Sequence, residues 1–129
     1  MVAFEDELRR TGSFMVSESN HTRSRETVIL TVPAGETLSA GTVLGKISAS
    51  GKYAPFDEDN GNGTEDVAGI LYNTVVNDDD APVDVQVAAV VRDAEVRLDD
   101  LIFYDDTNDA DAAVAALAEL GIIARPSGE

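Results

Sequence analysis

The sequence predicts a mainly β domain with one short C-terminal helix and an extended N-terminal arm. β-branched runs separated by Gly, Pro and Asp indicate short strands joined by turns. An Ala- and Leu-rich stretch close to the C-terminus, followed by a glycine, indicates one helix. The first 26 residues are polar and lack a sustained apolar period. We therefore divide the chain into an arm at residues 1–26 and one compact domain at residues 27–129.

The first half of the domain predicts three short strands. Residues 27–32 are a β-branched run, and residues 33–35 (Pro-Ala-Gly) supply a turn. Residues 36–47 contain a short apolar strand flanked by glycines, and residues 51–56 form another extended piece. Residues 57–66 are acidic and contain two glycines, which indicates a solvated loop.

The second half predicts a buried strand at residues 67–72 and a turn at residues 77–80. Apolar residues then alternate, so that a strand is expected to send one set of side chains into the core. That set is Val83, Val85, Val87, Ala89 and Val91.

The predicted helix begins after Asn108 and Asp109, which are suited to capping a helix N-terminus, and continues to Leu120. Gly121 is placed to end it, and residues 122–124 can form a last short strand. The order is thus strands first and a single helix near the end.

The charge of the chain argues against several classes of partner. Its formal net charge of -16 disfavours nucleic acid, because binding to phosphates depends on Lys and Arg. No apolar run is long enough for a membrane span, and acids stand where a signal peptide would carry bases. We expect neither a nucleic-acid nor a membrane partner.

The sequence offers no convincing catalytic, cofactor or metal site. The chain has no Cys and one His, and that residue, His21, lies in the predicted arm, where no pocket holds it. The acidic loop at residues 57–66 does not fit the spacing of an EF-hand. The Asp pairs elsewhere are typical of turns and helix caps. We therefore expect a protein that is not an enzyme and needs no cofactor.

Several segments, in order and spacing, resemble the lambda-type head decoration family of tailed bacteriophages. The likeness extends over residues 27–125, and none of its motifs is catalytic. The segments are AGTVLGKI (40–47), GKYAPF (51–56), EDVAGILY (65–72), VRDAEVRLDDL (91–101) and GIIAR (121–125).

This resemblance implies a β-clip-like fold that forms a homotrimer. Members of the family bind the outer surface of the expanded capsid and stabilise it, and their partner is the major capsid protein. Their N-terminal arm becomes ordered on the capsid, typically by adding a strand to an exposed edge. The resemblance thus implies a structural virion protein of the phage head.

We expect the arm to supply the capsid contacts, with apolar side chains filling pockets and bases meeting capsid acids. The candidate residues are Phe4, Leu8, Arg9, Arg10, Phe14, Met15, Arg23 and Arg25.

Two other functions fit the sequence less well. A nucleotide hydrolase on the same kind of fold would need acid, Ser and Arg motifs that the sequence lacks, and a strongly acidic surface would repel nucleotides. A glycan- or host-binding module on the virion usually presents an aromatic platform, and 5% aromatic residues without Trp make one hard to build. The decoration function is the prediction and the binding module its alternative.

Overall fold

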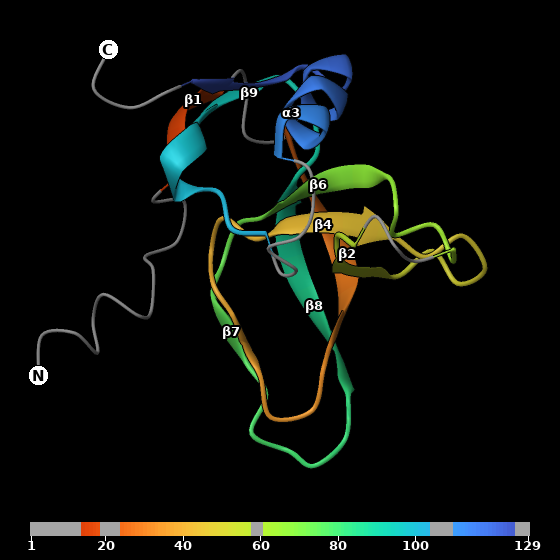
Figure 1. Ribbon diagram of the computed structural model, residues 1–129. Coiled ribbons are helices and arrows are strands. Elements are labelled where there is room, and N and C mark those ends of the chain that lie inside the picture. The colour runs from red at the N-terminus through yellow and green to blue at the C-terminus, as the bar shows by residue number, and fades with distance from the viewer. Residues whose placement is uncertain (1–13, 19–23, 58–60, 104–109, 126–129) are drawn as a thin grey trace, which may run out of the picture.

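Five strands of the domain close into a small β-barrel (Figure 1). The computed structural model describes residues 14–18, 24–57, 61–103 and 110–125. Within them, neighbouring barrel strands follow the order β2-β5-β4-β6-β8. The barrel strands are β2 (Arg25–Val32), β4 (Val43–Lys46), β5 (Tyr53–Pro55), β6 (Val67–Leu71) and β8 (Val83–Val90).

A second sheet and the helix cover one end of the barrel (Figure 1). In this sheet, β9 (Ala94–Arg97) lies between β1 (Met15–Glu18), which is antiparallel to it, and β10 (Ile122–Arg125), which is parallel. The single turn η1 (Leu98–Asp100) follows β9, and the helix α3 (Ala110–Glu119) precedes β10.

A two-stranded ribbon extends the barrel at the opposite end (Figure 1). It consists of β3 (Thr37–Leu38) and β7 (Val75–Val76), which follow β2 and precede β8 along the chain. The buried Asn77 holds the turns at this end together, since its Nδ2 lies 3.1 Å from the carbonyl oxygen of Val32 and 3.1 Å from that of Ala81. This distal end therefore depends on a buried amide that bridges its two turns.

The hydrophobic interior consists of two clusters, and β8 contributes to both. Val90 belongs to the first cluster, whereas Val87 and Ala89 belong to the second. The first includes Phe14, Val43, Ile70, Val96, Leu117 and Ile122. The second includes Leu30, Val32, Leu38, Leu44, Leu71 and Val91.

The predicted alternation along β8 is therefore only partly right. Val87, Ala89 and Val91 are buried as predicted, but Val83 and Val85 are only half-buried. Val90, which the alternation places outside, is fully buried. The reason is that this end of β8 has a cluster on each side, so both faces of the strand are covered.

Most other predicted elements are confirmed. The strands expected at residues 27–32 and 67–72 correspond to β2 and β6, and the last short strand corresponds to β10. The helix ends before Gly121, whose φ of 85° places it in the left-handed region. The predicted cap at residues 108 and 109 lies outside the described residues.

Residues 14–18 and 24–26 of the predicted arm are described by the structure and pack on the domain. Phe14 is fully buried in the first cluster, Met15 begins β1, and Arg25 begins β2. Residues 15–18 pair with the edge of β9, and this pairing satisfies the hydrogen-bonding groups of their backbone. The buried Phe14 ring adds buried apolar area, so the segment is ordered with few apolar anchors. The arm remains a prediction for the residues that precede Phe14.

Strand β4 passes so close to the 61–66 loop that one position admits no side chain. A Cβ on Gly45 would lie 2.5 Å from the Cα atom of Thr64 and 2.6 Å from its carbonyl oxygen. Thr64 is itself buried, and its side chain bonds to Asn62. Neither backbone can withdraw without moving a strand or this loop.

We expect Gly45→Ala to lower the free energy of unfolding by about 1–3 kcal/mol, because the added methyl group forces two backbones apart. Gly61→Ala is the matched control, since a Cβ there meets nothing within 4 Å, and we expect it to stay within about 1 kcal/mol of wild type. Urea unfolding of both variants measures the difference. Equal stabilities would show that the loop yields without cost.

Candidate functional site

The beginning of β1 is fixed firmly to the domain. The Phe14 ring meets the Tyr72 ring edge-on, with centroids 6.4 Å apart. The backbone N–H of Arg97 donates to the carbonyl oxygen of Phe14 over 2.8 Å. β1 then pairs with β9 through Met15 and Val96, with a bulge before Ser17. Any chain that precedes Phe14 therefore leaves the domain from a rigid point.

Arg25 is held at the same place. Its guanidinium carbon lies 3.9 Å from the centroid of the Tyr72 ring, which is a cation–π contact. Tyr72 thus contacts both the first described residue of the chain and the first residue of β2. The ring links the residue before β1 to the first residue of β2.

The outer face of the second sheet is basic and apolar. Glu95 and Arg97 on β9 alternate with buried residues and point outward, as do Ile123 and Arg125 on β10. Ile123 is 41% exposed, and Val16 at the β1 bulge is 47% exposed. Two arginines and one glutamate give this face a charge opposite in sign to that of the whole chain.

Arg125 and Glu95 form an ion pair on this face. The Nε and Nη2 atoms of Arg125 donate to the two carboxylate oxygens of Glu95 over 2.9 Å and 3.2 Å. The hydrogen bond from Arg125 lowers the pKa of Glu95, and the same bond raises the pKa of Arg125. The pair joins β9 to β10 across the outer face.

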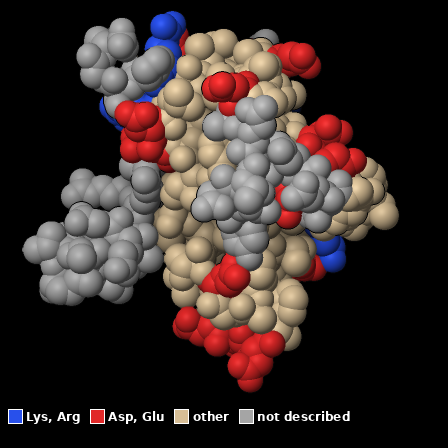
Figure 2. Space-filling model, viewed as in Figure 1, with Lys and Arg blue, Asp and Glu red and all other residues tan. Residues whose placement is uncertain are grey.

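The opposite end of the molecule is acidic. Asp78, Asp79 and Asp80 are exposed in the turn between β7 and β8, and Glu36 lies in the neighbouring turn after β2. Figure 2 shows acidic side chains at this end and basic side chains beside the second sheet. The basic outer face of the second sheet and the acidic turns therefore lie at different ends of the molecule, although η1 and α3 beside that sheet carry acids of their own.

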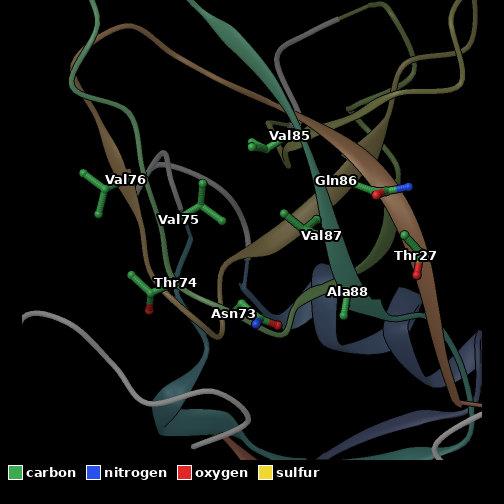
Figure 3. A pocket seen from close by; sticks show the side chains of 9 residues that line it. All are labelled: Thr27, Asn73, Thr74, Val75, Val76, Val85, Gln86, Val87 and Ala88. Atoms are coloured by element: carbon green, nitrogen blue, oxygen red, sulfur yellow. The ribbon is translucent and has the colours of Figure 1, made fainter.

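An uncharged groove lies on the side of the molecule, between β7 and β8 (Figure 3). Its volume is about 510 Å³. None of the nine residues that line it is Asp, Glu, Lys or Arg. They are Thr27, Asn73, Thr74, Val75, Val76, Val85, Gln86, Val87 and Ala88.

The described residues give little support to the other functions. They contain no group of three or more His, Asp or Glu side chains that could hold a metal ion. Over the same residues, no helix is long and apolar enough to cross a membrane. Their aromatic rings, which a glycan platform would need at the surface, are buried or half-buried: Phe14, Tyr53, Phe56, Tyr72 and Phe103.

A comparison with protein families decides the identity. The model of the family described as bacteriophage lambda head decoration protein D matches residues 5–123. The chain belongs to this family. A comparison with curated proteins found no match. The head decoration protein is thus a structural component of the bacteriophage virion, located on the capsid.

The structure places the predicted contact residues of this head decoration protein in different surroundings. Phe14 lies in the core, Met15 packs against it from β1, and Arg25 lies on Tyr72, so these three hold the domain together. The others lie outside the described residues and stay predictions: Phe4, Leu8, Arg9, Arg10 and Arg23.

Sequence reasoning missed the outer face of the second sheet. Arg97 and Arg125 are not among the predicted contact residues, which all lie within the first 25 residues. The alternation of Glu95 with Arg97 and of Ile123 with Arg125 was a usable signal. It places an apolar and two basic side chains on one face of two paired strands.

The Glu95–Arg125 pair predicts a pH dependence of stability. Because the folded pKa of Glu95 is below the ordinary value of 4.5, its contribution is present above that pH and disappears as the pH falls through the folded pKa. Glu95→Gln should therefore destabilise the protein at neutral pH and have a vanishing effect in acid, as measured by urea unfolding. In an Arg125→Gln background, the same substitution should have little effect at any pH. An undiminished effect in that background would contradict the pairing.

Proposed function

We propose that this head decoration protein binds the outer surface of the expanded capsid as a homotrimer and stabilises it. In this proposal, the arm preceding Phe14 attaches to the major capsid protein. The observation that carries the proposal is that the chain is fixed to the domain at Phe14 and β1, where the arm begins. A cement must transmit force from its attachment point to its body, and a buried ring next to a paired strand does this.

A force that pulls on the arm would be resisted at Phe14, the first residue that is packed in the domain. To withdraw Phe14, the chain must empty a fully buried site and break the hydrogen bond between its carbonyl and Arg97. Removing a buried phenylalanine ring costs about 3–5 kcal/mol. The weak point of the attachment therefore lies in the contact with the capsid and not in the domain.

The charges favour one orientation on the shell. The outer face with Arg97 and Arg125 adjoins the root of the arm, whose own bases are Arg9 and Arg10. The acidic turn with Asp78–Asp80 lies at the other end. A capsid surface that carries acids would attract the outer face of the second sheet and repel the acidic turn.

Trimerisation multiplies the strength of the attachment. Three arms on one body bind as a linked set, so once one arm is attached the local concentration of the others at the shell rises. Avidity gains of this kind reach about 10²–10⁴-fold. Each arm can therefore bind weakly while the trimer stays on the head.

Deletion of residues 1–13 tests the arm. We expect the shortened chain to keep its circular dichroism spectrum, because Phe14 and β1 are intact, and to lose decoration of expanded, undecorated heads in co-sedimentation. The full-length chain should bind at fixed stoichiometry and raise the temperature at which the heads release their DNA. A deletion extending to residue 25 would not test the arm alone, because it also removes β1 and a core side chain.

Deletion of residues 126–129 is the matched control, since it shortens the other terminus by a segment that also lies outside the described residues. It should decorate heads as the full-length chain does. If the chain without residues 1–13 sediments with heads at full stoichiometry, the arm is not the attachment.

A further inference from the structure

The 61–66 loop contains an Asn-Gly pair in which the side-chain amide is held beside the next backbone nitrogen. Asn62 is exposed, and Gly63 follows it. The Oδ1 atom of Asn62 accepts hydrogen bonds from the backbone N–H of Thr64 over 3.1 Å and from its hydroxyl over 2.7 Å. The first of these bonds closes a small ring that contains both the Cγ atom of Asn62 and the backbone nitrogen of Gly63. The fold therefore keeps an electrophilic carbon close to a potential nucleophile.

A carboxylate lies on that nucleophile. The backbone N–H of Gly63 donates to Oε1 of Glu65 over 2.8 Å. A carboxylate in this position can accept the proton of the nitrogen. The two donors of Thr64 can stabilise the negative charge that develops on Oδ1 when Cγ is attacked. Nucleophile, base and oxyanion donors thus meet at one amide, and the exposure of Asn62 gives water access to it.

The packing of the loop on β4 requires a glycine at position 63. Its φ of 111° lies in the left-handed region, and a Cβ there would run into the carbonyl oxygen of Lys46 and the backbone of Ser48. The N–H of Ser48 also donates to the carbonyl oxygen of Asn62 over 2.8 Å. No side chain can therefore shield the nitrogen of Gly63 unless the loop moves.

We infer that Asn62 is a site of spontaneous deamidation that is catalysed by its own loop. The backbone nitrogen of Gly63 attacks Cγ of Asn62, and its proton passes to the carboxylate of Glu65. The bond between Cγ and Nδ2 then breaks, and Nδ2 takes up that proton and leaves as ammonia. Water opens the resulting cyclic imide at either carbonyl, which leaves aspartate or isoaspartate at position 62. The inference goes beyond the proposed function and does not depend on it.

The products change the loop where it packs on β4. Each conversion adds a negative charge to a chain whose net charge is already -16. Isoaspartate also lengthens the main chain by a carbon atom beside Thr64, whose backbone leaves no room for a Cβ on Gly45. We expect the isoaspartate form to unfold at lower urea concentration than the unmodified chain.

Peptide mapping by mass spectrometry tests the site. The folded chain is incubated at neutral pH, and electron-transfer fragmentation then distinguishes asparagine, aspartate and isoaspartate at each position. Asn60-Gly61 is the same dipeptide and serves as the internal reference. We expect Glu65→Gln to slow conversion at Asn62 at least about tenfold, because glutamine still accepts the N–H of Gly63 but cannot take up its proton. The rate at Asn60 should not change.

Asp66→Asn is the matched control, since it removes the same charge from the same loop while Glu65 remains on Gly63. It should leave the rate at Asn62 unchanged, and circular dichroism shows whether both variants keep the fold. If Glu65→Gln converts at the wild-type rate, or if Asp66→Asn is slowed as much, the carboxylate of Glu65 is not the base and the inference is overturned.

The unfolded chain provides a second comparison. Urea abolishes the hydrogen bonds of the loop but leaves the sequence as it is, so conversion at Asn62 should slow to the rate at Asn60. If Asn62 survives in the folded chain and converts only in urea, the fold protects the amide. That result, or equal rates in the two states, would also overturn the inference.

Discussion

The pairing of β8 determines how the rest of the molecule is arranged. β2 covers one edge of β8 along all eight residues, whereas β6 covers the other edge only at its last two positions. Where both neighbours are present, Val90 and Ala89 enter separate hydrophobic clusters and the barrel closes. Where β6 is absent, the ribbon of β3 and β7 diverges and the groove remains. Closure of the core and the uncovered strand edge thus have the same origin.

The two ends of the molecule depend on different interactions. At the end with the second sheet, apolar burial dominates, since Phe14, Leu117 and Ile122 are all fully buried. At the acidic end, Val32 and Leu38 are buried, and the buried Asn77 also connects the two turns by hydrogen bonds to their carbonyls. An amide at this position tolerates the surrounding aspartates because it carries no charge itself. Asp78, Asp79 and Asp80 therefore repel one another only at the exposed surface of the turn.

Much of the fold follows from the sequence, because its signals are local. β-branched runs, turn residues and the glycine after the helix predict β2, β6 and the end of α3. The strand β1 could not be predicted in this way, because residues 15–18 become a strand only through pairing with β9, far along the chain. The groove was also out of reach, since it depends on where β6 leaves β8. Of the predicted contact residues, Phe14 is buried against a distant sheet, and such burial leaves no periodic pattern in the sequence.

The charge of the chain bears on the proposed attachment to the capsid. A net charge of -16 makes copies of the chain repel one another, whereas the outer face of the second sheet, with Arg97 and Arg125, is basic. In the proposed function, arms attached at neighbouring positions of the shell would raise the local concentration of the domains and so offset part of this repulsion. The basic face lies beside β1, where the proposed arm joins the domain, so the same end of the molecule would carry both the attachment and the charge that suits an acidic shell.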